Sequence, residues 1–215
     1  MRAKIPVEGK GVKLVNFELE HVPVYEEWYK DKELLRLTAT EEMDHESLVT
    51  SQAMYAYDDD KIAFLVVVKD EEGKDKIIGD CTLFMDIVDD RDMGEFNVMI
   101  ADKAYRRKGY ASTAVILAMM WASRYMKLKE FFVKIDKENL PSIKMFEKLG
   151  FKFYHYNRHF HENEYRLQID NSLAKKWIQE IGLPIRMYPC FFEQTMLQTR
   201  RRRRRSRVYC FHLLK

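Results

Sequence analysis

The chain of 215 residues has few cysteines and no long apolar run, and both absences limit what it can be. The three cysteines are far apart and form neither a metal-ligand pattern nor a disulfide framework, which suits a reducing compartment. No stretch of about 18 apolar residues is available to cross a membrane. The first residues also lack the apolar segment of a secretion signal. These absences predict a cytoplasmic protein with no membrane span and no bound metal.

The composition that remains is typical of a globular domain. Hydrophobic residues make up 47% and charged residues 33% of a chain long enough to bury a real core. The net charge of +3 is unevenly distributed. From Arg186 to Lys215, nine basic residues stand against one acidic residue, a net +8 that leaves −5 for the other 185 residues. We expect one domain over residues 1–183 and a basic, disordered tail over residues 184–215.

Hydrophobic spacing and turn residues predict alternating strands and helices. Strands are expected at 12–17, 63–68, 77–88, 95–101, 131–135, 151–156 and 164–169, and helices at 24–37, 40–57, 112–126, 141–149 and 173–181. Two β-α-β crossings, around residues 102–130 and 136–151, favour an α/β fold with a mixed sheet whose central strands include parallel neighbours. Ligands of such sheets bind beyond the carboxyl ends of the strands.

One run of residues lies at such a strand end, between an apolar strand and a long apolar helix: Arg106-Arg107-Lys108-Gly109-Tyr110-Ala111. The first N–H groups of the helix have no partner in the chain, and the helix dipole adds positive charge, so this turn can hold phosphates. Small residues let a ligand approach the backbone, and the basic side chains supply counter-charge. A solvated basic turn is the alternative. The run is neither a Walker loop nor a dinucleotide fingerprint, because the lysine-serine pair and the glycine triplet are missing.

Two blocks of the sequence resemble the GNAT family of acetyl-coenzyme-A-dependent N-acetyltransferases. The first is the basic-x-x-Gly-x-small run, and the second is Asn-x-x-Ser-x-x-x-Phe-x-x-x-Gly-Phe over residues 139–151. The resemblance implies a central mixed sheet flanked by helices, acetyl-CoA as co-substrate and no metal. Segments 20–28, 34–39, 94–101 and 141–146 are similar to the eukaryotic alpha/beta-tubulin N-acetyltransferase group. That similarity implies the N-terminal α-amine of tubulin as acceptor and a role in microtubule stability.

The resemblance also assigns roles within the site. Backbone N–H groups from Arg107 to Ser112 would hold the diphosphate, and one N–H group freed by a β-bulge in the preceding strand would bond the thioester carbonyl. Asn139 would bond the pantetheine arm or a water, with capping of the next helix as the alternative. The expected cofactor-binding residues are Met99, Ile100, Ala101, Arg106, Arg107, Lys108, Gly109, Tyr110, Ala111, Ser112, Asn139, Ser142 and Phe146.

The proton transfers are less defined by the resemblance. A general base helps because the amine must be neutral to attack, and Glu95 stands where some histone-acetylating relatives hold a catalytic glutamate. With Asn139 it forms the predicted catalytic pair; an exposed strand-edge carboxylate in an acid-rich stretch is the alternative. Phe146 replaces the tyrosine with which many members protonate the thiolate, and a phenyl ring donates nothing. The thiolate then leaves unaided, or a water, Tyr105 or Tyr110 substitutes.

Two features have no place in this scheme. Six consecutive arginines, Arg200 to Arg205, predict disorder because like charges repel. They are interpreted as a nuclear-import or nucleic-acid patch, as a contact for acidic tubulin tails, or as the product of an exon-boundary error, since the similarity fades after Leu183.

His155, His159 and His161 lie close together in the sequence, but no carboxylate or thiol pattern accompanies them, so surface histidines are expected rather than a metal site.

Three functions therefore compete. The first is an acetyl-CoA-dependent N-acetyltransferase acting on a protein amine, and the second is a non-catalytic module that binds microtubules or nucleic acid. The third is an acetyltransferase for small amines, which shares the cofactor site and differs in its acceptor.

Overall fold

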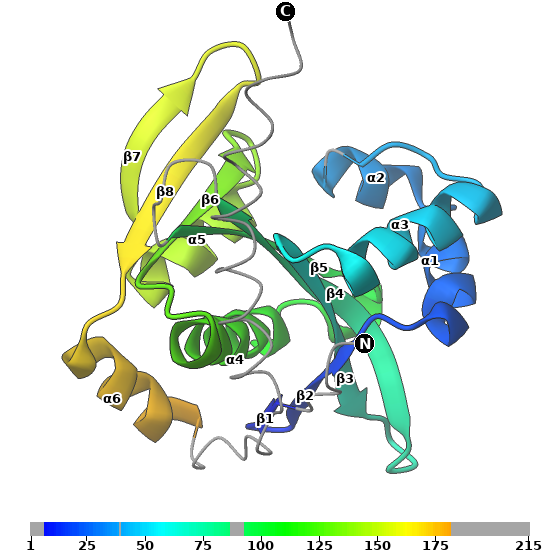
Figure 1. Cartoon of the computed structure of the whole chain (residues 1–215), viewed down its shortest axis with the longest axis horizontal. Coiled ribbons are helices and arrows are strands. Elements are labelled where there is room, and N and C mark those ends of the chain that lie inside the picture. The colour runs from blue at the N-terminus through cyan, green and yellow to red at the C-terminus, as the bar shows by residue number, and fades with distance from the viewer. Residues whose placement is uncertain (1–6, 39, 87–92, 182–215) are drawn as a thin grey trace, which may run out of the picture.

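A single eight-stranded sheet carries the fold in the computed structural model, which describes residues 7–38, 40–86 and 93–181 (Figure 1). The strand order is β1-β2-β3-β4-β5-β6-β8-β7. Neighbouring strands are antiparallel except β5 and β6, so the predicted mixed sheet with a parallel central pair is confirmed. The strands are β1 Val7–Gly9, β2 Val12–Asn16, β3 Lys61–Lys69, β4 Asp75–Asp86, β5 Met93–Ile100, β6 Glu130–Asp136, β7 Lys152–Asn157 and β8 Glu162–Gln168.

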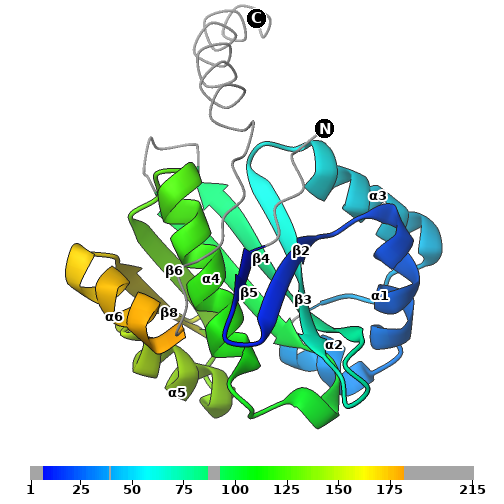
Figure 2. The same cartoon turned by 90° about the horizontal axis from the view of Figure 1, so that it is seen from below.

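Helices cover both faces of the sheet (Figures 1 and 2). One face carries α1 Val22–Trp28, α2 Lys32–Thr38 and α3 His45–Tyr57. The other carries α4 Tyr110–Tyr125, α5 Leu140–Leu149 and α6 Asn171–Ile181. Two short 3-10 helices, Leu19–His21 and Lys103–Tyr105, precede α1 and α4. Within the described ranges, no helix has the length and apolar character needed to cross a bilayer.

Strand β3 shows how two separate cores form. Alternate side chains of a strand point to opposite faces, so Phe64 and Val66 pack on the α4 side while Ala63 and Leu65 pack on the α1–α3 side. Helix α4 is buried along most of its length. Its Trp121 packs edge-on against Phe64, with 5.2 Å between the ring centroids. The larger core therefore holds α4 rigidly against the sheet, which fixes the position of its first turn.

Two expectations about the elements are wrong. The helix expected at 24–37 is two helices, because the Asp31 carboxylate accepts from the backbone N–H groups of Glu33 and Leu34 and starts α2 afresh. The helix expected from residue 40 begins at His45, where Asp44 caps it through Ser47 N–H at 2.9 Å. A further feature was not part of the expectation: β8 inserts between β6 and β7, so the strands joined by the second β-α-β crossing are not neighbours.

The junction of β5 with β6 decides where a ligand can enter. The two strands pair only from Met93–Glu130 to Glu95–Phe132 and then part. On its other side, β5 pairs with β4 without any register shift over all eight residues. No β-bulge is therefore found within β5 up to Ile100. Immediately beyond it, the N–H groups of Ala101 and Asp102 both donate to Ile78 O, at 2.9 and 3.2 Å, so two residues oppose one there, as in a β-bulge. The backbone groups at the end of β5 are also released because β6 diverges. The turn expected at residues 89–92 and the tail over 184–215 lie outside the described residues.

Candidate active site

The first turn of α4 presents unpaired backbone N–H groups, as the sequence predicts. Gly109 caps the helix with φ of +85°, a conformation that side-chain-bearing residues rarely adopt, and it makes no side-chain capping bond. A Cβ atom added there would meet nothing within 4 Å. The intrahelical bonds begin with Thr113 N–H to Gly109 O at 3.1 Å. Within the described part of the chain, Tyr110, Ala111 and Ser112 donate no backbone hydrogen bond, so their N–H groups are available to an anion.

The three basic side chains of this turn differ in what they contact. Arg106 turns back onto the end of β5, where its guanidinium donates to Ile100 O at 2.8 Å and Ala101 O at 3.1 Å. The Lys108 ammonium lies 5.4 Å from the ring centroid of Tyr105. Arg107 is exposed and adopts a φ of +62°. Arg106 therefore holds the turn in place, and its predicted role as a phosphate counter-charge stays a prediction.

Replacing Arg106 separates these two roles. Arg106→Ala removes two charge-assisted hydrogen bonds, and we expect about tenfold weaker binding of coenzyme A by calorimetry because the turn loses its anchor. Arg106→Lys should bind coenzyme A equally weakly, because the lysine side chain has no planar fork that reaches both carbonyl oxygens. Arg124→Ala, with the same charge change at the exposed far end of α4, is the matched control. Wild-type affinity in Arg106→Lys would show that charge alone matters.

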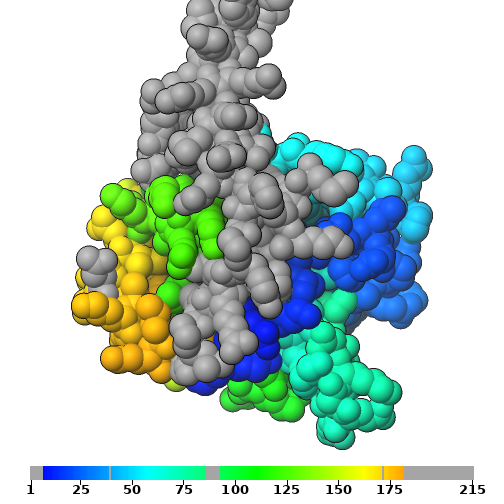
Figure 3. Space-filling view, turned by 60° about the horizontal axis from the view of Figure 1, so that its bottom comes forward, coloured from blue at the N-terminus to red at the C-terminus, as the bar shows by residue number. Residues whose placement is uncertain are grey.

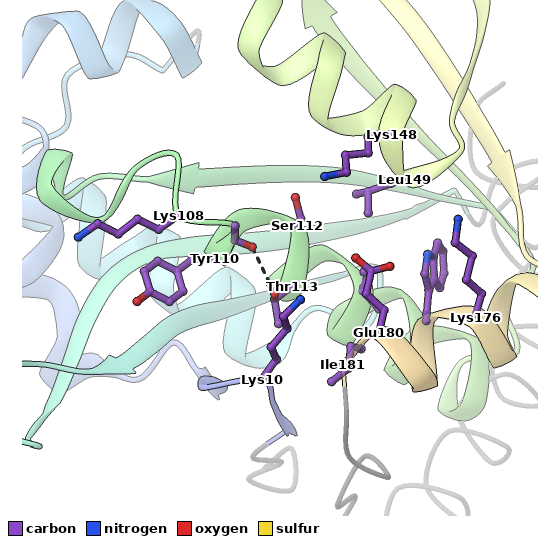
Figure 4. Close-up of a pocket in the computed structure, with 13 residues that line it drawn as sticks. Lys10, Lys108, Tyr110, Ser112, Thr113, Lys148, Leu149, Lys176, Glu180 and Ile181 are labelled. Atoms are coloured by element: carbon purple, nitrogen blue, oxygen red, sulfur yellow. Dashed lines mark hydrogen bonds between the residues drawn. The ribbon is translucent and has the colours of Figure 1, made fainter.

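A pocket of about 390 Å³ adjoins the first turn of α4 (Figure 4). It is lined by Gly109, Ser112 and Thr113 of the turn, and also by α5, α6 and the β1–β2 hairpin. Both the hairpin and α6 are visible on the face of the molecule in Figure 3. Four lysines and a single acid supply the charge of the lining: Lys10, Lys108, Lys148, Lys176 and Glu180. A pocket with this charge beside a helix N-terminus suits a multiply phosphorylated ligand.

Sequence reasoning missed this lysine pocket. Lys10, Lys148 and Lys176 are separated by long stretches of chain, and each reads locally as an ordinary solvated charge. In Figure 4 the Lys148 side chain lies over Ser112, whereas Lys108 extends away from it. Packing of α6 on the core through Trp177, which is 1% exposed, brings Lys176 to the site. No local signal predicts that packing.

The backbone of β5 faces the diverging β6 at only some of the predicted positions. Ala101 N–H donates to Ile78 O on β4 at 2.9 Å. Backbone groups in an antiparallel pair alternate in direction, so Met99 also faces β4, while Val98 and Ile100 face away from it. Of Met99, Ile100 and Ala101, only Ile100 thus turns its N–H group toward the space between β5 and β6. Of the three residues expected to donate a backbone N–H to the thioester carbonyl, only Ile100 is oriented to do so. The N–H group of Val98 has the same orientation.

Glu95 lies inside the sheet and not at an edge. It pairs with Phe84 on β4 and Phe132 on β6, and its carboxylate Oε2 is 2.8 Å from Lys134 Nζ. Its side chain points to the α1–α3 face and is 22% exposed. Its Oε2 is thus held by the Lys134 ammonium. The structure therefore corrects the strand-edge interpretation, and the catalytic role of Glu95 stays a prediction.

The second block forms the start and the buried face of α5. Asn139 is its N-cap, with Oδ1 accepting from Ser142 N–H at 3.3 Å, so the capping interpretation of Asn139 is confirmed. Ser142 is partly exposed. Phe146 is 3% exposed and packs edge-on against Phe151 in the core, with 5.0 Å between the ring centroids. The cofactor contacts predicted for these residues, and the catalytic role of Asn139, stay predictions.

An acidic residue that the sequence analysis passed over lies next to this region. Asp80 on β4 is the register partner of Met99, and its Oδ2 accepts a hydrogen bond of 2.7 Å from the Tyr25 hydroxyl of α1. Burial raises the pKa of Asp80 to about 6, against the lowering effect of the Tyr25 hydrogen bond. Burial and the charge of Asp80 raise the pKa of Tyr55 to about 12 and that of Tyr29 still further. The contact joins residues 55 positions apart, so no motif reports it.

The late histidines lie in the β7–β8 hairpin. The Tyr156 hydroxyl and His161 Nδ1 are 3.0 Å apart, and the rings of His159 and Phe160 meet edge-on. Among the residues that the structure describes, no group of three histidine, cysteine or carboxylate side chains is placed to hold a metal ion.

The fold and the α4 turn define the class of protein. Residues 12–152 match the acetyltransferase (GNAT) domain. The chain belongs to the GNAT family of acetyltransferases, and it is an acetyl-CoA-dependent N-acetyltransferase. It is 37% identical over 179 residues to alpha/beta-tubulin-N-acetyltransferase 9 of Mus musculus, covering 80% of this chain and 74% of the mouse protein. It is 38% identical over 168 residues to an N-acetyltransferase 9-like protein of Caenorhabditis briggsae, covering 75% of this chain and 85% of that protein.

Solved structures share the fold at low identity. A RimL ribosomal L7/L12 alpha-N-protein acetyltransferase in complex with coenzyme A superposes with a TM-score of 0.66 at 13% identity, over 78% of this chain and 99% of that chain. A spermidine N-acetyltransferase of Vibrio cholerae, in complex with CoA and spermine, gives a TM-score of 0.63 at 17% identity, over 77% and 98% of the two chains. These similarities confirm the GNAT architecture predicted from the sequence.

Proposed function

We propose that the enzyme binds acetyl-CoA with its diphosphate on the first turn of α4, and that it acetylates the N-terminal α-amine of alpha/beta-tubulin. The observation that carries the cofactor site is the set of unpaired N–H groups of Tyr110, Ala111 and Ser112 beside an open Gly109. The fit is supported by the adjoining lysine pocket, whose charge suits the remaining phosphate of the coenzyme.

The pantetheine arm then extends into the space that β5 and β6 leave open. The backbone groups of Val98 and the N–H group of Ile100 face that space and offer hydrogen bonds to an amide-bearing chain, whereas Ile100 O already accepts from Arg106. A backbone N–H group there is placed to stabilise the oxyanion that develops on the thioester carbonyl, a contribution of roughly 3 kcal/mol in comparable sites. The face of β5 toward α4 is filled by the main core, including Phe96. The acceptor amine therefore comes from the α1–α3 face.

Tubulin as acceptor is supported by the names of relatives, such as the mouse and human alpha/beta-tubulin-N-acetyltransferase 9. The human protein is 35% identical over 180 residues, 80% of this chain. Acetylation of tubulin would place the enzyme in the cytoplasm, in contact with microtubules, and would promote their stability. The arginine run, with its predicted nuclear or nucleic-acid role, lies outside the described residues.

The test is acetyl transfer from labelled acetyl-CoA by the full chain. Acceptors are purified tubulin, peptides with the N-terminal sequences of its two subunits, the same peptides with a blocked α-amine, and spermidine. We expect label on tubulin and on the free peptides, located at the α-amine by mass spectrometry, and none on the blocked peptides. Label on lysine side chains alone, or on spermidine alone, would contradict the proposed acceptor and leave the acetyl-CoA site in place.

A further inference from the structure

Asp80 is a carboxylate of the sheet that lies, by strand register, next to the backbone proposed to hold the thioester. It stands on β4 directly opposite Met99, beside Ile100, and neighbouring strands are about 4.8 Å apart. Its side chain and that of Met99 point to the same face, the one from which the acceptor approaches. The opposite face is closed by Cys81 and Leu83, which are fully buried in the main core. Asp80 itself remains partly exposed.

Among the residues that the structure describes, Asp80 is surrounded by phenols and has no cationic partner. The Tyr25 hydroxyl donates to its Oδ2, and Tyr29 and Tyr55 are the other titratable groups that face it, from the end of α1 and from α3. No ion pair joins Asp80 to a lysine or arginine within the part of the chain that the structure describes. Glu95, by contrast, has its Oε2 committed to Lys134. A carboxylate without a cationic partner is the better proton acceptor, because nothing stabilises its charged form by direct pairing.

We propose that Asp80 is the general base of acetyl transfer and that Tyr25 is its positioning residue. The Asp80 carboxylate takes one proton from the acceptor ammonium. The nitrogen lone pair then forms the C–N bond, and the C–S bond breaks with its electron pair on sulfur. The remaining extra proton passes from nitrogen to the thiolate, which gives the amide and the free thiol, and Asp80 releases its proton to water. The raised pKa of Asp80, about 6, lets it serve near neutral pH.

This inference rests on the acetyl-CoA site proposed above and is independent of which amine is the acceptor. Its test is the pH dependence of kcat/KM from about pH 5 to about pH 9 for the full-length wild type and three variants. The release of the coenzyme A thiol measures the rate. For the wild type we expect the plot of log kcat/KM against pH to change slope near pH 6. Asp80→Asn keeps the shape of the side chain but takes up no proton. We expect it to lower kcat about 100-fold, to abolish that change of slope and to leave the affinity for coenzyme A unaltered.

Tyr25→Phe and Glu95→Gln complete the experiment. Tyr25→Phe removes a hydrogen bond that favours the charged carboxylate, so the change of slope should move to higher pH, an effect that a merely structural contact would not produce. Glu95→Gln tests the competing candidate base: if Asp80 is the base, the change of slope in this variant stays at the wild-type pH. The proposal is overturned if Asp80→Asn retains the wild-type profile, or if Glu95→Gln alone abolishes it. A wild type that binds no coenzyme A and acetylates no amine would instead overturn the cofactor site and, with it, this inference.

Discussion

Gly109→Asp is expected to weaken binding of coenzyme A by at least about 100-fold, or roughly 2.7 kcal/mol. An aspartate carboxylate at this position would lie beside the free N–H groups of the first turn of α4 and compete with the diphosphate for them. Its negative charge would also repel the diphosphate. The space around Gly109 is open and aspartate tolerates a positive φ, so the fold should persist. Calorimetry with coenzyme A measures the effect.

Gly73→Asp is a closely matched control. Gly73 has a φ of +77°, close to the +85° of Gly109, and a Cβ atom there also meets nothing within 4 Å. It lies in the turn between β3 and β4, so the substitution introduces the same charge and similar backbone strain away from α4. We expect wild-type affinity in this control. Equal affinity in Gly109→Asp and Gly73→Asp would show that the diphosphate binds elsewhere.

Asp80→Asn is expected to make the protein more stable at neutral pH while it makes the enzyme slower. The pKa of Asp80 is raised in the folded state from 3.8 to about 6, so the folded protein holds this proton more tightly than the unfolded chain. Stability from this group is complete below pH 3.8 and is lost as the pH rises through 6. The shift corresponds to about 3 kcal/mol at neutral pH. Asparagine carries no charge and should recover much of that loss.

Chemical denaturation at a series of pH values measures this difference. The gain in the free energy of unfolding for Asp80→Asn should be largest above pH 6 and should vanish toward pH 4. Asp75→Asn is a control of opposite sign: hydrogen bonds from Lys69 and Lys13 lower the pKa of Asp75, so its replacement should reduce stability at neutral pH. An Asp80→Asn protein that is less stable than wild type at neutral pH would contradict the raised pKa of Asp80. A gain in stability with a loss of rate is typical of a residue retained for activity.

The α4 turn could be predicted because its chemistry is local. Gly109 between an apolar strand and an apolar helix already implies a strand-to-helix turn with free N–H groups, and the structure places it there. Pro141 and Gly150 likewise mark the first turn and the end of α5. The break between α1 and α2 is also encoded locally, by the aspartate cap Asp31. The apolar residues on either side of it nevertheless favour one continuous helix in the sequence pattern.

The sequence by itself determined the order of the elements apart from β1 and the break before α2, and also the mixed sheet and the first turn of α4. Each of these follows from spacing and from the short-range geometry of caps and turns. Only the tertiary structure decided that β8 inserts between β6 and β7, that Arg106 turns back onto β5, and that Asp80 meets Tyr25. The lysine pocket was decided in the same way, by the packing of α6 and the β1–β2 hairpin beside α4. Such contacts depend on which strands and helices pack together. Burial of the whole core selects that packing, and no stretch of neighbouring residues specifies it.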